Sequence, residues 1–190
     1  MSRATLTGLL EAFGELFLVP GAFQASRFEA ALKSEWAPGS LRDPLQCMLT
    51  GPRTGLDVLY AEHFLHGFRR PTVHLQASAH RTGSLLDPGL LEELAGIYAL
   101  AGIEPVDVVH PDHLGAMVLL LGVLLQRLQV AEGPRADVLE FAARDLVERH
   151  LGPLLADIQK GLQDAGPKDP YRAAADALES CLGICGRVLA

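Results

Sequence analysis

The chain has 190 residues, a length that suits one domain with a substantial core. Its formal net charge is −7, and an acidic chain without a Lys/Arg stripe argues against nucleic acid as a partner, because neutralised phosphates supply most of that affinity. Leu and Ala far outnumber Val, Ile and Thr, which favours helices over strands. We therefore expect an all-α fold, a single-domain helical bundle of about eight to ten helices over residues 1–190.

Cysteine content and hydropathy give expectations about the compartment. Three cysteines do not make a disulfide framework, and Cys181 and Cys185 lie in an Ala/Leu-rich stretch, where we expect buried thiols. The N-terminus lacks the pattern of a secretory signal peptide, and the apolar run Leu114–Leu125 is too short to span a bilayer. We expect a cytoplasmic protein without stable membrane insertion.

Gly and Pro divide the sequence into segments of helix length. The first expected helices cover residues 5–19, 22–36, 41–49 and 54–67. Residues 68–84 have no clear period and are expected to be a long connection. Further helices are expected at 87–102, from 113 to the stop at Gly133–Pro134, and at 134–152, 154–165 and 169–189. Two of them begin with Asp-Pro, at Asp87 and Asp169, a pattern typical of an N-cap followed by proline at the first helical position.

The positions of the apolar residues predict which face of a helix is buried. The segment after His113 is apolar nearly all round, which predicts a helix at the centre of the bundle. Tyr60, Phe64 and Tyr98 continue apolar stripes, so each is a candidate either for the core or for the wall of a groove.

The polar residues 110–113, His-Pro-Asp-His, precede this central helix and allow several interpretations. His110 as an N-cap, Pro111 at the first helical position and Asp112 as a first-turn acid would explain them without any function. His110, Asp112 and His113 are also close enough in sequence for a metal site, although they lack the spacing of helical ligand pairs. The sequence contains no nucleophile elbow, phosphate-binding loop or dinucleotide fingerprint, so no motif of these kinds indicates an enzyme.

The order Tyr98, Gly102 and then Pro111-Asp112-His113 at the head of an apolar helix resembles the signature of the TorD/DmsD/NarJ family of redox-enzyme maturation chaperones. Three further segments are similar to that family, and the resemblance covers roughly residues 10 to 185: YAEHFLHGFRRPTVHLQASAHRTG, RHLGPLLADI and DPYRAAADALESCL. The chain departs from the family at Met117, near which a Glu is frequent, and at Leu154, where a Trp is frequent.

The resemblance implies a helical domain with a hinge, here expected at 103–110, that performs no chemistry and needs no cofactor. It implies that the protein binds the twin-arginine signal peptide and the cofactor-free form of a molybdenum oxidoreductase catalytic subunit, assists cofactor insertion and delays export. We expect a monomer, with some dimer formed by exchange of C-terminal helices across the hinge.

A twin-arginine peptide is basic and then apolar, so its receptor needs acids beside an apolar groove. Glu104, Asp107 and Asp112 flank the central apolar helix. The candidate signal-peptide site is Tyr60, Phe64, Tyr98, Glu104, Asp107, His110, Pro111, Asp112 and His113. The alternative is a helical metal- or small-ligand-binding sensor that uses His110, Asp112 and His113.

Overall fold

A computed structural model describes residues 3–19, 25–33, 37–51, 55–65, 73–105, 109–166 and 168–189. The expected all-α fold is confirmed: the described residues form helices and a single isolated antiparallel bridge between Gln76 and His113. The first half contains α1 (Arg3–Leu18), α2 (Ala25–Lys33), α3 (Gly39–Thr50), α4 (Leu56–Tyr60), the π-helix η2 (Ala61–Leu65), α5 (Ala77–Thr82) and α6 (Pro88–Leu100). The second half contains α7 (Leu114–Leu128), α8 (Pro134–Asp145), the π-helix η3 (Leu146–Leu151), α9 (Gly152–Gly161) and α10 (Pro170–Val188).

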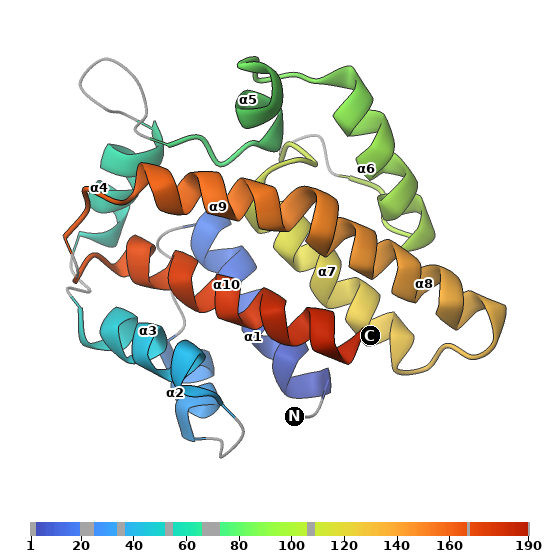
Figure 1. Ribbon diagram of the computed structural model, residues 1–190, viewed down its shortest axis with the longest axis horizontal. Helices are drawn as coiled ribbons and strands as arrows, with labels where there is room; N and C mark the ends of the chain where they lie inside the picture. Colours follow the sequence, from blue (N-terminus) through green and yellow to red (C-terminus); the bar gives the residue numbers. More distant parts are fainter. Residues whose placement is uncertain are drawn as a thin grey trace.

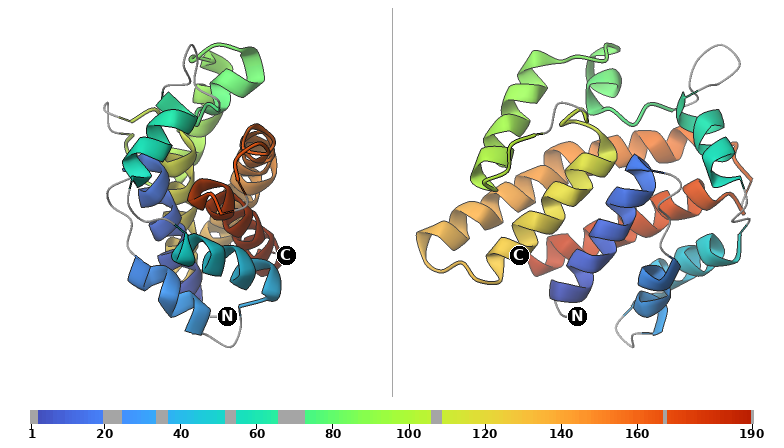
Figure 2. Two further views of the ribbon diagram at one scale, coloured as in Figure 1. Left: turned by 90° about the vertical axis from the view of Figure 1, so that its left-hand side faces the viewer. Right: turned by 180° about the vertical axis from the view of Figure 1, so that it is seen from behind.

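The central position expected for the apolar helix is confirmed in α7. Ten of its residues are buried, and α7 packs along α1 on one side and against α8 on another. Seen from behind, α1 and α7 lie side by side (Figure 2). Close approach depends on glycine, since a Cβ at Gly115 would meet the Gly14 carbonyl oxygen at 2.7 Å.

The remaining helices form layers around this pair. α10 packs against α3 and α9, and α8, η3 and α9 run on as one long helical rod across the molecule (Figure 1). Helices α5 and α6 lie along the side of this rod that faces away from α10 (Figure 1). Cys181 and Cys185 are free thiols and fully buried in α10, as expected.

Both Asp-Pro helix starts are confirmed. The Asp87 carboxylate accepts the Leu90 amide at the start of α6, and the Asp169 carboxylate accepts the Tyr171 and Arg172 amides at the start of α10.

Two expectations about elements are wrong. Residues 68–84 are not a structureless connection, because Ala77–Thr82 forms α5. The rod does not break at Gly152–Pro153. In the wide turn of η3, the Gly152 amide donates to the Val147 carbonyl oxygen, five residues earlier. The helix can therefore continue through Pro153, which has no N–H to donate.

Candidate functional site

The residues Pro111, Asp112 and His113 form a turn just before α7, which we call the Pro-Asp-His turn. Main-chain hydrogen bonds tie this turn to the segment that leads into α5. The Ala77 amide donates to the Asp112 carbonyl oxygen at 3.0 Å, and the Leu114 amide donates to the Leu75 carbonyl oxygen at 2.7 Å. The turn therefore joins the start of α5 to the start of α7.

The Asp112 side chain is fully buried. Its Oδ2 accepts the Ser78 amide at 2.9 Å, so the carboxylate caps the N-terminus of α5 from another part of the chain. Oδ1 has no hydrogen-bond partner among the described residues. The sequence interpretation of Asp112 as a first-turn acid of the following helix is wrong, since α7 begins only at Leu114.

His113, and not His110, is the N-cap of α7. Its backbone is extended, and its Nδ1 accepts the Gly115 amide at 3.2 Å. Burial lowers the pKa of His113 to about 4, with Asp112 opposing and His110 supporting the shift. A neutral ring at physiological pH suits this cap, because Nδ1 accepts a hydrogen bond only when it carries no proton.

Tyr98 connects α6 to the same turn. Its hydroxyl donates to the Pro111 carbonyl oxygen at 3.2 Å, and burial, together with the nearby Asp112, raises the pKa of Tyr98 to about 12. Gly102 ends α6 with a φ of 59°, a conformation that favours glycine. Tyr98 and Gly102 therefore have structural roles: Tyr98 attaches the end of α6 to the Pro-Asp-His turn, and Gly102 lets the chain leave the helix.

Ser78 and Asp87 continue the polar contacts away from the turn. The fully buried Ser78 accepts the Asp87 amide on its Oγ at 3.1 Å, and Asp87 in turn caps α6. Buried polar groups of this kind hold α5, α6 and the start of α7 in one arrangement, since each one left without a partner is costly.

An apolar pocket of about 230 Å³ lies beside the Pro-Asp-His turn, between the end of α1, the end of α6 and α7. Tyr98, Glu104 and Pro111, three of the residues proposed from the sequence for the signal-peptide site, are among its lining residues, and Glu104 is exposed. His110 is exposed next to this lining. Asp107 lies outside the described residues. The remaining lining residues are Leu18, Ile103, Pro105, Val109, Ala116, Leu119, Leu120 and Val123.

Tyr60 and Phe64 are not among the residues that line this pocket. Both are buried in an aromatic cluster with Phe17 and Tyr171, and the Tyr60 hydroxyl donates to the Phe17 carbonyl oxygen at 3.0 Å. In this structure they pack α4 and η2 against α1 and α10.

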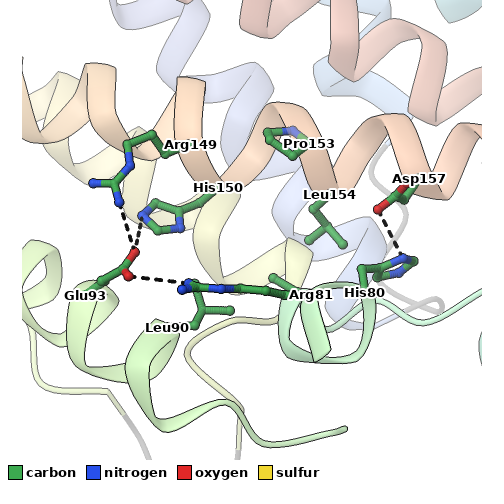
Figure 3. Close-up of a pocket in the computed structure, with 10 residues that line it drawn as sticks. His80, Arg81, Leu90, Glu93, Arg149, His150, Pro153, Leu154 and Asp157 are labelled. Atoms are coloured by element: carbon green, nitrogen blue, oxygen red, sulfur yellow. Dashed lines mark hydrogen bonds and ion pairs between the residues drawn. The ribbon is translucent and has the colours of Figure 1, made fainter. Parts of the chain in front are cut away.

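A second pocket, of about 360 Å³, was missed by the sequence analysis. It lies between α5, α6 and the rod of η3 and α9, and we call it the polar pocket (Figure 3). Its lining residues are Ala77, His80, Arg81, Leu90, Glu93, Arg149, His150, Pro153, Leu154 and Asp157. They come from two regions far apart in sequence, residues 77–93 and 149–157, so no local motif could have indicated the pocket.

The alternative of a metal-binding sensor finds no site in the part of the chain that the structure describes. No three His, Cys, Asp or Glu side chains there are arranged to hold a metal ion. His113 already uses Nδ1 in its cap, and the Asp112 carboxylate faces the α5 amides. Within the same described residues, no helix is long and apolar enough to cross a bilayer.

The family model of the nitrate reductase delta subunit matches residues 41–158, more than half of the chain. The chain belongs to the nitrate reductase delta subunit family. None of the curated proteins matches it. The matched region runs from α3 to α9 and contains the Pro-Asp-His turn, the residues of α6 and α7 at the apolar pocket, and the entire lining of the polar pocket.

Members of the nitrate reductase delta subunit family are chaperones of the NarJ/TorD type, which assist the maturation of molybdoenzymes. The resemblance seen in the sequence is thereby confirmed. The family is one of maturation chaperones and not of catalysts, and its partner is a molybdoenzyme.

Proposed function

We propose that this chain binds the twin-arginine signal peptide of a cofactor-free molybdenum oxidoreductase in the cytoplasm, assists cofactor insertion and delays export until insertion is complete. The observation that carries the proposal is the apolar pocket beside the Pro-Asp-His turn. Among the described residues, its lining is almost entirely aliphatic or aromatic, and the carboxylate of Glu104 is the charged group.

The chemistry of this pocket matches the two parts of such a peptide. Burial of the apolar part would contribute about 25 cal/mol for each Å² removed from water. Glu104 is exposed at the pocket, and a carboxylate there would accept charge-assisted hydrogen bonds from a guanidinium group.

Titration calorimetry with the signal peptide of the client tests the proposal. Ala116→Leu places a larger side chain in the pocket without lowering helix propensity. We expect it to weaken peptide binding about tenfold, because the apolar part of the peptide loses its space, an effect of about 1.4 kcal/mol. Glu104→Gln should weaken binding of the arginine-bearing peptide by a similar factor.

Ala95→Leu is the matched control. Ala95 is an exposed residue of α6 outside the lining of the described pockets, so its substitution should leave affinity unchanged. Absence of binding to the wild-type chain would refute the proposed function, whereas equal binding by wild type and Ala116→Leu would refute only its placement in the apolar pocket.

A further inference from the structure

Helix α8 exposes apolar side chains on the face that points away from the core. Its Leu139, Ala142 and Ala143 are buried, whereas Phe141 is 70% exposed and Val138 is 45% exposed. Every other Phe and Tyr among the described residues is buried. An aromatic ring gains free energy when it leaves water, so this face favours contact with another molecule.

The position of α8 leaves room for such a contact. The helix is the outer end of the rod formed by α8, η3 and α9, and it extends past the C-terminal end of α10 (Figure 1). Seen from behind, it also extends past α7 (Figure 2). A second helix can therefore lie along α8 at the edge of the molecule.

Opposite charges lie on the two sides of Phe141 along the same face. Residues three or four apart share one side of an α-helix, so Asp137, one turn before Phe141, and Arg144, one turn after it, continue the face. Asp137 is exposed, and the Arg144 side chain is 44% exposed. Along the helix, the face is therefore acidic, then apolar, then basic.

Arg144 is held in place without using all of its donors. Its Nη2 donates to the Glu140 carboxylate and to the Leu189 carbonyl oxygen at the end of α10. A guanidinium group also carries donors on Nη1 and Nε, and within the described part of the chain these stay available for a further carboxylate. Arg144 is thus a positioned cation one turn from an exposed aromatic ring.

This face is complementary to itself. When two α8 helices pack antiparallel about a two-fold axis close to Phe141, Asp137 of one copy lies opposite Arg144 of the other, because each is about one turn from the axis. The Phe141 rings meet near the axis, and each packs against Val138 of the other copy. Such a contact has an apolar centre between two ion pairs and uses the same surface on both copies. In a parallel pairing, like charges would meet.

We infer that the exposed face of α8, formed by Asp137, Val138, Phe141 and Arg144, is a dimer interface that binds a second copy of this chain. Contact between two helix faces is small beside the roughly 1,200–2,000 Å² buried in stable complexes, so the dimer is weak and reversible. It differs from a dimer formed by exchange of C-terminal helices, because each chain keeps its own helices. The inference does not depend on the signal peptide or on either pocket.

Sedimentation equilibrium of the full chain at concentrations up to about 1 mM measures the association. We expect wild type to dimerise reversibly and Phe141→Gln to dimerise at least about tenfold more weakly, since an aromatic residue at the centre of an interface carries much of the binding energy. Val58→Gln is the matched control. Val58 of α4 is 56% exposed, and α4 lies at the other end of the molecule from α8 (Figure 1), so this variant should dimerise like wild type. Thermal melts check that each variant keeps its fold.

Charge reversal tests the antiparallel pairing. Asp137→Arg faces Arg144 of the other copy with a like charge, and Arg144→Asp does the same to Asp137, so each variant alone should dimerise about tenfold more weakly than wild type. A mixture of the two variants brings opposite charges together at both ends and should form a heterodimer as tight as the wild-type dimer.

Three results would overturn the inference. The first is a wild-type chain that stays monomeric up to about 1 mM. The second is a Phe141→Gln variant that dimerises like wild type, which would assign the dimer to exchanged helices or to another face. The third is a mixture of the two charge variants that associates no better than either variant alone.

Discussion

Asp112 presents no surface to solvent, and its Oδ2 accepts the Ser78 amide at the first turn of α5. A carboxylate in that position stabilises a short helix whose own N-cap residue, Gln76, offers no side-chain hydrogen bond. In this conformation the carboxylate is buried against α5, whereas the sequence analysis proposed that Asp112 contacts the arginines of the peptide. The structure therefore favours a structural role for Asp112.

Removal of the Asp112 carboxylate tests this role. We expect Asp112→Ala to lower the free energy of unfolding by about 1–3 kcal/mol, because a buried amide loses its acceptor. The exposed Asp164 is the control, and Asp164→Ala should change stability by no more than about 0.5 kcal/mol. Urea denaturation gives both values. Unchanged stability together with weaker peptide binding would instead assign the carboxylate to the peptide site.

The cap formed by His113 gives stability a pH dependence. The pKa of His113 is about 4 in the folded chain and about 6.5 in an unfolded chain, so the unfolded state binds more protons between these values. The stability that the neutral cap contributes is complete above about pH 6.5 and is lost as the pH falls toward the folded pKa of about 4.

His113→Asn replaces the capping Nδ1 with a side-chain oxygen that can also cap the helix, and it removes the titrating ring. We expect the melting temperature of this variant to fall less than that of wild type between pH 6.5 and 4. Burial also lowers the pKa of His150, which adds acid sensitivity in both proteins, so the difference between the two curves isolates His113. Parallel curves from scanning calorimetry would contradict a cap that depends on the neutral imidazole.

At the scale of elements, the predictions succeeded where the signals were local. Asp87 and Asp169 cap the helices that follow them, and Gly102 ends α6 as expected. Helix α5 was missed because it is short and its capping carboxylate comes from Asp112, far along the chain. The break expected at Gly152–Pro153 does not occur because the π-turn of η3 removes the usual conflict between proline and the preceding turn.

The contact between α1 and α7 should be sensitive to a single methyl group. A Cβ at Gly115 would lie 2.7 Å from the Gly14 carbonyl oxygen and 3.1 Å from the Leu18 amide nitrogen. Because these are backbone atoms that move only with their helix, we expect Gly115→Ala to destabilise the chain by about 1–3 kcal/mol.

Gly96 of α6 provides the matched control. It is exposed and has no atoms within 4 Å of a Cβ built there, so Gly96→Ala should stabilise the chain by up to about 1 kcal/mol through helix propensity. Chemical denaturation compares the two. A stable Gly115→Ala variant would show that the two helices are less closely packed than the structure describes.

At the scale of the whole molecule, the sequence identified the fold and family, while the candidate site was predicted only in part. Tyr98, Glu104 and Pro111 meet at the apolar pocket, because they lie close in sequence around one loop. Tyr60 and Phe64 belong to an aromatic cluster instead, since an apolar helical stripe indicates burial without saying what covers it. The polar pocket required the tertiary arrangement of α5, α6 and η3–α9.

Three whole-molecule expectations from the sequence stay predictions. They are the single domain over residues 1–190, the hinge at 103–110 and the monomer with some exchanged dimer. Of the hinge, the structure describes residues 103–105 and 109–110.

The proposed role in maturation predicts an effect on the client. In cells without this chain, the molybdoenzyme client should accumulate with less molybdenum, because its signal peptide is not held back from export during cofactor insertion. Elemental analysis of the purified client measures this, and expression of the wild-type chain should restore the metal content while Ala116→Leu restores less. Full molybdenum loading in its absence would contradict the proposed role.

Photo-crosslinking tests the central claim most directly. A signal peptide of the client that carries a photoreactive side chain in its apolar part is irradiated with the chaperone, and the adducts are mapped by mass spectrometry. We predict adducts on residues that line the apolar pocket, such as Leu119 and Val123, and their loss in Ala116→Leu. Efficient crosslinks confined to other surfaces would contradict the assignment of this pocket to the signal peptide.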